Sequence, residues 1–219
     1  MEYKYELHCH TGCVSRCGRV EPEKIVKLYK EKNYNGIVVT DHYSPMTFTP
    51  NWCPQKQIDF YLEGYRRMKK AAGDDFTVLL GMELRHYFTA NDYLIYGIDE
   101  AFLYNAGNLM TVWEKDVYKL AKKNGYLVYQ AHPFRTGIRR CNTKYIDGVE
   151  IYNGKTDKSA NEKAYKWAKE NNKLMCSGSD FHTVKNLARG GIITDKKINN
   201  NDDLLMLLKG QNFKMIKEY

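Results

Sequence analysis

The stretch Ile37-Val38-Val39-Thr40-Asp41-His42 decides the class of fold. It opens with a short, uninterrupted apolar run, which is typical of a strand buried on both faces in a parallel sheet. A carboxylate and an imidazole follow at once, so the strand presents two polar side chains at its carboxyl end. Helical patterns lie on both sides, one starting at Pro22 and one over residues 58–72. A buried strand between two helices predicts an α/β fold.

The same strand and helix unit recurs along the whole chain. Strands are predicted over residues 6–10, 37–41, 77–84, 93–98, 126–132, 148–153, 174–180, 191–194 and 213–216, and the remaining helices over residues 109–124, 159–171 and 202–208. No linker or repeat interrupts them, so we expect one domain over residues 1–219, either an open doubly wound sheet or a closed barrel. The sequence lacks G-x-G-x-x-G and G-K-[ST] motifs after its first strand, which would have favoured the open sheet.

The composition is that of an ordinary globular protein. Hydrophobic residues make up 43% and charged residues 27% of the 219, which excludes a disordered or collagen-like chain. The net charge of +8 favours anionic partners, and phosphate esters and nucleic acids both fit. We find no apolar run long enough for a membrane span and no apolar signal-peptide core, so we expect a cytoplasmic protein without a membrane partner, whose six cysteines are thiols.

Five of the six histidines stand at or just past the carboxyl end of a predicted strand, in clusters with carboxylates. The clusters are His8-x-His10, Asp41-His42, Glu83, His132 and Asp180-x-His182. In a barrel these strand ends meet at one mouth. One such histidine alone would indicate little, but burying so many ionisable groups without a cation is costly, so the set predicts a metal centre. The sixth, His86, has no carboxylate at ligand spacing and is expected at the surface or rim.

The chain also resembles a known family. The motifs His8-x-His10, Thr40-Asp41-His42, Gly81-Met82-Glu83, His132-Pro133 and Asp180-x-His182 occur in the order and spacing of the PHP (polymerase and histidinol phosphatase) superfamily, over nearly the whole chain. The resemblance implies a distorted (β/α)7 barrel in a single domain. It also implies a centre of two or three divalent ions, manganese, iron or zinc, and the hydrolysis of phosphoesters.

Carried over to this sequence, the resemblance assigns metal ligands and catalytic residues. One ion would be bound by His8, His10 and Asp180, Glu83 would bridge it to a second ion held by His132, and His42 with His182 would hold a third. The candidate catalytic residues are Glu83, in its bridging position, and Asp180, as a proton donor to the leaving oxygen. A histidine of the third site is the alternative donor.

Two departures from the family pattern concern the number of ions. Many relatives have an Asp or His soon after the first motif, where this chain has Ser15-Arg16-Cys17-Gly18. Cys17 would therefore ligate a soft metal as thiolate, or the third site would be weaker. The histidine expected after Glu83 for the second ion is also missing from segment 91–97. Asp41 is expected to orient an imidazole or to serve as an occasional ligand.

The favoured function is a metal-dependent phosphoesterase that hydrolyses a small phosphomonoester by metal-activated hydroxide. Arg135 is a candidate for binding the substrate phosphate, with a solvated loop arginine as an equal alternative, whereas Arg189 is expected to be solvated. Glu150 and Asn153 end another strand at the same mouth, where we expect them to support the ligands or contact substrate.

A long irregular segment, residues 43–57, follows the second motif and is placed to act as a wall or lid over a closed pocket. It contains Phe48 and Trp52, which are expected to be exposed. The alternative is an ordinary surface excursion.

Two other functions stay open. A nuclease or exonuclease with the same metal centre is supported by the net charge of +8 and by 18 tyrosines interleaved with lysines, as in Tyr29-Lys30, although such pairs also suit helix packing. A non-catalytic metal or nucleic-acid binding module is the third class. The sequence does not predict which phosphoester is the substrate, which metal is bound, or the oligomeric state.

Overall fold

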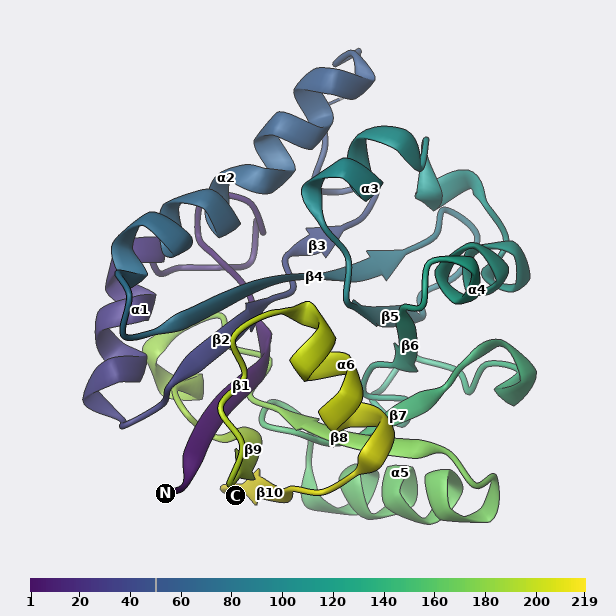
Figure 1. The fold of residues 1–219 in the computed structure, drawn as a ribbon. Helices are drawn as coiled ribbons and strands as arrows, with labels where there is room; N and C mark the ends of the chain where they lie inside the picture. Colours follow the sequence, from purple (N-terminus) through teal and green to yellow (C-terminus); the bar gives the residue numbers. More distant parts are fainter. Residues whose placement is uncertain (50) are drawn as a thin grey trace.

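The computed structural model describes residues 1–49 and 51–219. Ten strands form one sheet in the order β10-β9-β1-β2-β4-β5-β6-β7-β8, with β3 paired to β4 beside this path. The strands are β1 (Tyr3–Cys9), β2 (Gly36–Val39), β3 (His42–Tyr43), β4 (Thr77–Arg85), β5 (Asp92–Tyr96), β6 (Leu127–Gln130), β7 (Gly148–Asn153), β8 (Leu174–Gly178), β9 (Gly190–Thr194) and β10 (Lys214–Lys217). Figure 1 shows the sheet curling around a central space, with the two termini side by side.

The sheet closes into a distorted barrel where the ends of β1 and β8 meet. Cys9 forms an isolated parallel bridge with Phe181, just past β8. The amide of His10 donates to the Phe181 carbonyl at 3.0 Å, and the Phe181 amide donates to the carbonyl of His8 at 3.1 Å. The prediction of a single-domain, distorted α/β barrel is confirmed.

All nine predicted strands are present, but two of them run against their neighbours. β5 is antiparallel to β4 and β6, and β9 is antiparallel to β1 and β10. The connection from Arg85 to Asp92 is too short for the crossover that parallel strands need, so β4 and β5 form a hairpin. The two-residue strand β3 was not predicted.

In the part of the chain that the structure describes, six α-helices surround the sheet: α1 (Pro22–Glu31), α2 (Pro54–Ala72), α3 (Glu100–Asn105), α4 (Glu114–Lys123), α5 (Lys158–Glu170) and α6 (Asn201–Gly210). α1 packs on α2, which contacts β4, whereas α4 and α5 contact β6 and β7 on another side (Figure 1). Among the described residues, no helix combines the length and the apolar character that a membrane crossing requires.

The helices of the structure differ from the predicted ones in three places. α2 begins at Pro54 and not at residue 58, because proline suits a first helical turn that needs no amide donor. The helix predicted over residues 109–124 divides into a 3₁₀ turn, Leu109–Thr111, and α4. The short helix α3 was not predicted, although Asp99 caps it by accepting from the Phe102 amide.

α6 closes the end of the barrel at which the parallel strands begin. Its residues Leu204 and Leu208 are fully buried in an apolar cluster with interior side chains of the strands, namely Tyr5, Leu7, Val38, Leu94, Tyr96, Leu127 and Tyr129. The preceding loop is fixed to the same end, since the Thr77 hydroxyl, at the start of β4, donates to the carbonyl of Ile198 at 2.8 Å. This half of the barrel interior is therefore dry and packed.

Two β-bulges change which side chains face the interior near the other end. In β1, Glu6 pairs with Ile37 and Cys9 with Val39, so β1 carries one extra residue between these pairs. As a result Leu7 packs inside the apolar cluster while its neighbour His8 also reaches the interior, further along. A second register shift, between Glu150 and Tyr152, likewise changes which side chains of β7 face the interior.

The segment 43–57 packs against the barrel, and the expectation that Phe48 is exposed was wrong. Phe48 is 5% exposed and lies edge-on to Tyr43, with ring centroids 4.9 Å apart. Trp52 is partly buried against Phe60 of α2, at 5.2 Å. Pro50 lies outside the described residues.

Candidate metal centre

The predicted ligands converge at the open end of the barrel. Three groups of side chains place their ligand atoms within 4.8 Å of one another: His8, His10 and Asp180; Glu83, Asp92 and His132; and His10, His42 and His182. Together they contain all seven residues that were predicted as ligands, and they add Asp92. Six of these seven are buried, and the side chain of His42 is 19% exposed.

Glu83 lies at the centre of the three groups. Its Oε1 atom is 3.3 Å from Nε2 of His8 and 3.0 Å from Nε2 of His132. Its Oε2 atom is 3.3 Å from Nε2 of His10 and 2.7 Å from Nδ1 of His42. One carboxylate thus faces imidazoles of every group, which is the geometry of a bridging ligand.

The distances within the first group fit a shared cation. Nε2 of His8 and Nε2 of His10 are 3.1 Å apart, and both lie close to Oδ1 of Asp180, at 3.6 and 3.4 Å. Ligand atoms at about 2.1 Å from a tetrahedral ion are separated by about 3.4 Å. Among the described residues, the buried Nδ1 atom of His132 has no hydrogen-bond partner. Glu83 Oε2 and Asp180 Oδ1 face imidazole nitrogens at 2.7 and 3.1 Å without the alignment of a hydrogen bond. These donor atoms suit divalent metal ions.

Hydrogen bonds outside the groups fix the orientation of two imidazoles. Glu150 accepts from Nδ1 of His8 at 2.8 Å, which leaves Nε2 of that ring facing the centre. Nδ1 of His10 is 3.1 Å from the hydroxyl of Ser15, which donates to Asp41 at 2.7 Å. Asp41 also accepts from the amide and hydroxyl of Thr11, so it lies behind the ligands and supports them.

The pKa values of the histidines and carboxylates in the centre are shifted by burial and by one another. Burial alone would lower the pKa of His8, but surrounding carboxylates, Glu150 first, raise it well above its usual value. The imidazoles lower the pKa values of Glu83 and Asp180 well below their usual range, against the effect of burial. Burial and two neighbouring imidazoles lower the pKa of His10 to about 3, which keeps this shared ring neutral and able to bind a cation.

Cys17 lies at the edge of the third group. Burial would raise the pKa of its thiol, but contacts with His182 and His42 lower it to about 6. Cys17 is exposed and belongs to none of the three groups, so its role as a ligand stays a prediction.

Sequence reasoning missed Asp92, which is 1% exposed and 3.7 Å from Nε2 of His132. A histidine, not a carboxylate, was expected in this segment, and ligands were expected only at the carboxyl ends of strands. Because β5 runs antiparallel, its first residue and not its last lies at the mouth. Asp92 also accepts from Nε and Nη2 of Arg85 across the hairpin, at 2.6 and 2.5 Å.

The backbone is unusual at two residues of the centre. His132 has φ +29° and Asp180 has φ +51°, both in the left-handed region that non-glycine residues rarely occupy. Such conformations cost about 1–3 kcal/mol each and persist where the surroundings impose them. Nearby, a Cβ atom on Gly178 would lie 2.4 Å from Cβ of His8, so only glycine allows this close approach.

Arg135 lies beside the centre, and Arg189 lies apart from it. Nη2 of Arg135 donates to Oδ2 of Asp180 at 2.6 Å and to Oδ1 of Asn153 at 2.7 Å. Nε of Arg189 donates instead to the carbonyl of Glu218, near the C-terminus. The guanidinium of Arg135 is thus held next to the carboxylate of a candidate ligand.

His86 is buried, contrary to the expectation of a surface or rim residue. It is 4% exposed and lies edge-on to Tyr93, with ring centroids 5.6 Å apart. Burial lowers its pKa. His86 belongs to none of the three groups.

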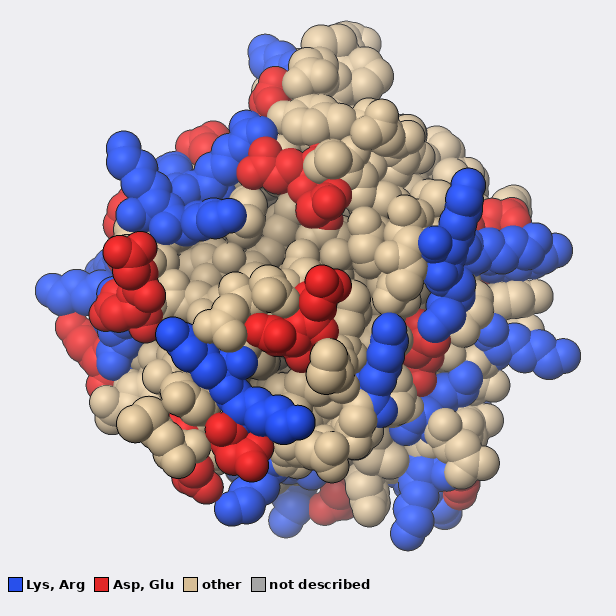
Figure 2. All heavy atoms as spheres, viewed as in Figure 1, with Lys and Arg blue, Asp and Glu red and all other residues tan. Residues whose placement is uncertain are grey.

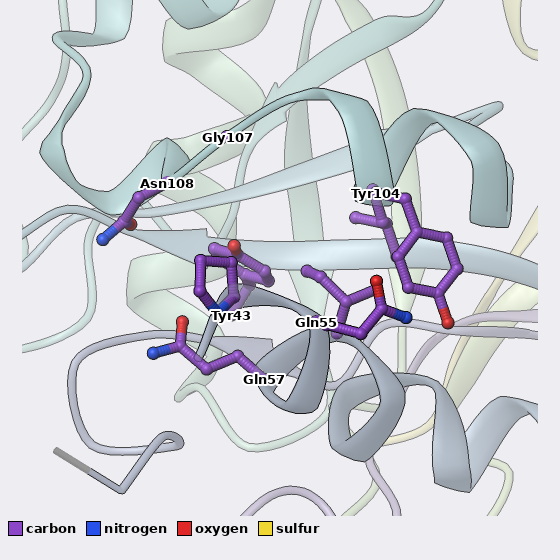
Figure 3. A pocket seen from close by; sticks show the side chains of 9 residues that line it. Tyr43, Gln55, Gln57, Tyr104, Gly107 and Asn108 are labelled. Atoms are coloured by element: carbon purple, nitrogen blue, oxygen red, sulfur yellow. The ribbon is translucent and has the colours of Figure 1, made fainter. Parts of the chain in front are cut away.

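A separate pocket of about 240 Å³ lies between the first turns of α2 and the end of α3. Figure 3 shows Gln55 and Gln57 on one side of it and Tyr104 and Asn108 on the other. None of its lining residues belongs to the metal-ligand groups. On the face that α6 covers, basic side chains lie in several separate groups with acidic ones between them, so the net charge forms no continuous stripe there (Figure 2).

Comparison with known families assigns the chain. The family model of the PHP domain matches residues 6–182, and a model described as PHP-associated matches residues 158–212. The chain belongs to the PHP domain family. This confirms the predicted family and the predicted class of enzyme, a hydrolase.

Solved structures with the same fold are distant in sequence. PsfC from Pseudomonas syringae has a TM-score of 0.70 at 13% identity, covering 93% of this chain and 88% of that chain. A candidate metal-dependent phosphoesterase from Bifidobacterium adolescentis has 0.54 at 15% identity, covering 94% and 95%. The lesion-specific endonuclease Q of Pyrococcus furiosus has 0.67 at 14% identity, covering 98% of this chain and 58% of that one. No curated protein matches the chain in sequence.

Proposed function

We propose that this PHP protein is a metal-dependent phosphoesterase that hydrolyses a phosphomonoester. The observation that carries the proposal is the position of Glu83, whose two oxygens face imidazoles from all three ligand groups at 2.7–3.3 Å. We assign His8, His10 and Asp180 to one ion and His132 to a second, with Glu83 between them. His42 and His182 belong to a third position.

Divalent ions held here would supply hydroxide at neutral pH and neutralise charge on the phosphoryl oxygens. The protein's own groups do the rest. Glu150 and Ser15 hold the imidazoles of His8 and His10 in place. Asp180 was one candidate proton donor to the leaving oxygen, but its neighbours lower its pKa well below the usual range, so it stays ionised. We therefore propose the alternative donor, a histidine of the third group.

Arg135 is proposed to bind the substrate phosphate. Its side chain is 28% exposed, and its contacts with Asp180 and Asn153 fix the guanidinium at the edge of the centre. Nη2 is taken by these two contacts, which leaves Nη1 to donate a charge-assisted hydrogen bond to a phosphoryl oxygen. We therefore favour a small, singly esterified phosphate as substrate.

The first experiment is elemental analysis of the protein purified without added metal, beside His8→Ala. Two or more Mn, Fe or Zn ions per chain, with fewer in the variant, would support the assignment. No metal even after anaerobic reconstitution would refute it and leave a binding module.

The second experiment compares phosphate release from a panel of small phosphomonoesters with hydrolysis of bis(p-nitrophenyl) phosphate and of labelled oligonucleotides. A phosphatase releases phosphate from the monoesters. Arg135→Met should raise KM for the monoester, while Arg189→Met serves as the matched control. Cleavage of oligonucleotides alone would overturn the proposal.

Two broader proposals accompany this one. We propose that residues 1–219 work as a single PHP domain. We also propose a cytoplasmic location, because all six cysteines are free thiols, as expected in a reducing compartment.

A second candidate function, a nuclease, is favoured by one observation. Phe88, in the loop between β4 and β5, stacks on Trp113, with ring centroids 4.9 Å apart and planes at 25°. The two side chains are 57% and 65% exposed, and the neighbouring Tyr87 is 55% exposed. Tyr87 and Phe88 lie on the hairpin loop that follows Glu83, Trp113 directly precedes α4, and such exposed rings are placed to stack with nucleobases.

The nuclease candidate makes a distinct prediction. Base stacking contributes about 1–3 kcal/mol per base, so Trp113→Ser should raise KM for an oligonucleotide about tenfold or more. The KM for a small phosphomonoester should not change. Tyr165→Ser, an exposed tyrosine on α5, is the control.

A further inference from the structure

Lys155 reaches into the candidate metal centre, and neither the sequence motifs nor the family pattern points to it. It follows β7, and its amide donates to Oδ1 of Asn153 at 3.0 Å, which fixes the turn. Its Nζ atom lies 3.2 Å from Nδ1 of His182 and 3.9 Å from Oδ1 of Asp180. The side chain is 32% exposed, so the ammonium enters the centre from the solvent side.

The group that Lys155 approaches differs in charge from the other two. The first group contains Asp180, and the second contains Glu83 and Asp92. The third group consists of His10, His42 and His182 and contains no carboxylate. Two carboxylates of the other groups approach it, because Oε2 of Glu83 is 2.7 Å from Nδ1 of His42 and Oδ1 of Asp180 is 3.1 Å from Nδ1 of His182. Both carboxylates are shared with the first two ion positions, so a third divalent ion would gain little charge compensation, and the ammonium beside His182 would repel it.

Two further side chains have to be placed relative to the third group. Cys17 is exposed and belongs to none of the three ligand groups. Arg135 holds the other oxygen of Asp180, at 2.6 Å, so this carboxylate lies between two protein cations. Lys155 therefore has a partner oxygen, Oδ1 of Asp180, that Arg135 does not occupy.

We propose that Lys155 supplies the third positive charge of this centre. Its ammonium replaces an ion at His10, His42 and His182, so the chain holds two ions and one lysine. The inference rests on the proposed function, because it takes the first two ion positions as given. In this role Lys155 and Arg135 approach Asp180 at different oxygens, Oδ1 and Oδ2.

Metal counting tests the inference without relying on activity. The wild-type protein is loaded anaerobically with excess Mn²⁺, desalted and analysed for manganese per folded chain, and titrated by calorimetry. We expect two ions in wild type, three in Lys155→Met, and two in Lys155→Arg, which keeps the charge. Lys158→Met, an exposed lysine on the first turn of α5, is the matched control and should hold two.

Activity gives a second readout. Lys155→Met should lose at least about tenfold in rate at two equivalents of Mn²⁺ and regain most of it in excess Mn²⁺, whereas wild type should be insensitive to the excess. Three ions in wild type, or two in Lys155→Met, would overturn the inference and leave the proposed function standing. A wild-type chain that binds no metal would refute both. Circular dichroism of each variant shows that the fold is kept.

Discussion

The mouth of the barrel and its closed end fill the same interior with opposite chemistry. At the closed end, Leu204 and Leu208 of α6 pack against leucine and tyrosine side chains of the strands. At the mouth, imidazoles and carboxylates crowd to within 4.8 Å of one another, most of them buried. Apolar burial stabilises the fold, whereas burying charges costs free energy unless they are paired. The closed end therefore provides the stability that lets the mouth keep its costly arrangement.

The largest expected effect comes from a substitution in the metal centre at the mouth of the barrel. Glu83→Gln removes the charge that faces four imidazoles, so we expect kcat/KM for the best phosphomonoester to fall at least a thousandfold, about 4 kcal/mol in the transition state. Bound metal should fall as well, as measured by elemental analysis. The exposed Glu162→Gln, on α5, should leave both unchanged. Retention of more than a tenth of the activity would exclude Glu83 from the bridging role.

The next effect concerns the closed end. Leu204 is fully buried, so Leu204→Ala should reduce the free energy of unfolding by about 2–5 kcal/mol, measured by urea denaturation. The metal content per folded chain should not change. Met206, 69% exposed on the same helix, provides the control, because Met206→Ala should change stability by less than about 0.5 kcal/mol. Loss of metal in Leu204→Ala would show that the two ends are not independent.

Sequence and structure agree best where one local pattern fixes the outcome. The strands were predicted because their apolar runs are short and buried, and His8 and His10 were predicted on one face because strand side chains alternate. The direction of β5 could not be predicted from apolar runs, and Asp92 was missed for that reason. The register shift in β1 also left no signal, because it depends on pairing with β2.

Glu6 shows what the register shift requires. Its buried carboxylate accepts from the amides of Leu7 and His8, which lie within the shift, and from the amide of Ser179 across the barrel seam, each at 2.9 Å. The hydroxyl of Tyr29 donates to its other oxygen at 2.8 Å. A lone glutamate in an apolar strand gave no hint of this role, since the partners come from distant parts of the chain.

Glu6 lies between the two ends and gives the third prediction. Burial raises its pKa to about 7, above the value of the unfolded chain. The folded state then holds the proton more tightly, so its contribution to stability is complete below about pH 4.5 and is lost as the pH rises through 7. The free energy of unfolding of wild type relative to Glu6→Gln should fall by about 3 kcal/mol over this range.

Urea denaturation at pH 4.5, 6 and 8 checks this prediction. Glu23→Gln is the control, because Arg67 lowers the pKa of Glu23, so its contribution is lost only as the pH falls below about 4.5 and stays nearly constant over this range. A difference between wild type and Glu6→Gln that is constant with pH would mean that Glu6 is ionised in the folded state throughout.

The smallest expected effect comes from Glu150. It distinguishes a residue that orients metal ligands from a residue that is itself a ligand. Glu150 accepts from the imidazole of His8 at 2.8 Å and from the amide of His132 at 3.0 Å, so it supports both proposed ion positions. In Glu150→Gln the amide keeps the shape but loses the charge and one acceptor. The affinity for Mn²⁺, measured by calorimetry, should therefore fall about 10–100-fold.

The activity of Glu150→Gln in excess metal distinguishes two roles for Glu150. If Glu150 only orients its partners, saturating Mn²⁺ should restore kcat to within a few-fold of wild type, whereas Glu83→Gln should stay inactive at any metal concentration. If kcat does not recover, Glu150 acts on the substrate or on an ion directly. In that case Glu150, like Glu83, would be required for the reaction itself. The assignment of Glu83 as a bridging ligand and Glu150 as an orienting residue, which rests on their distances to the imidazoles, would fail.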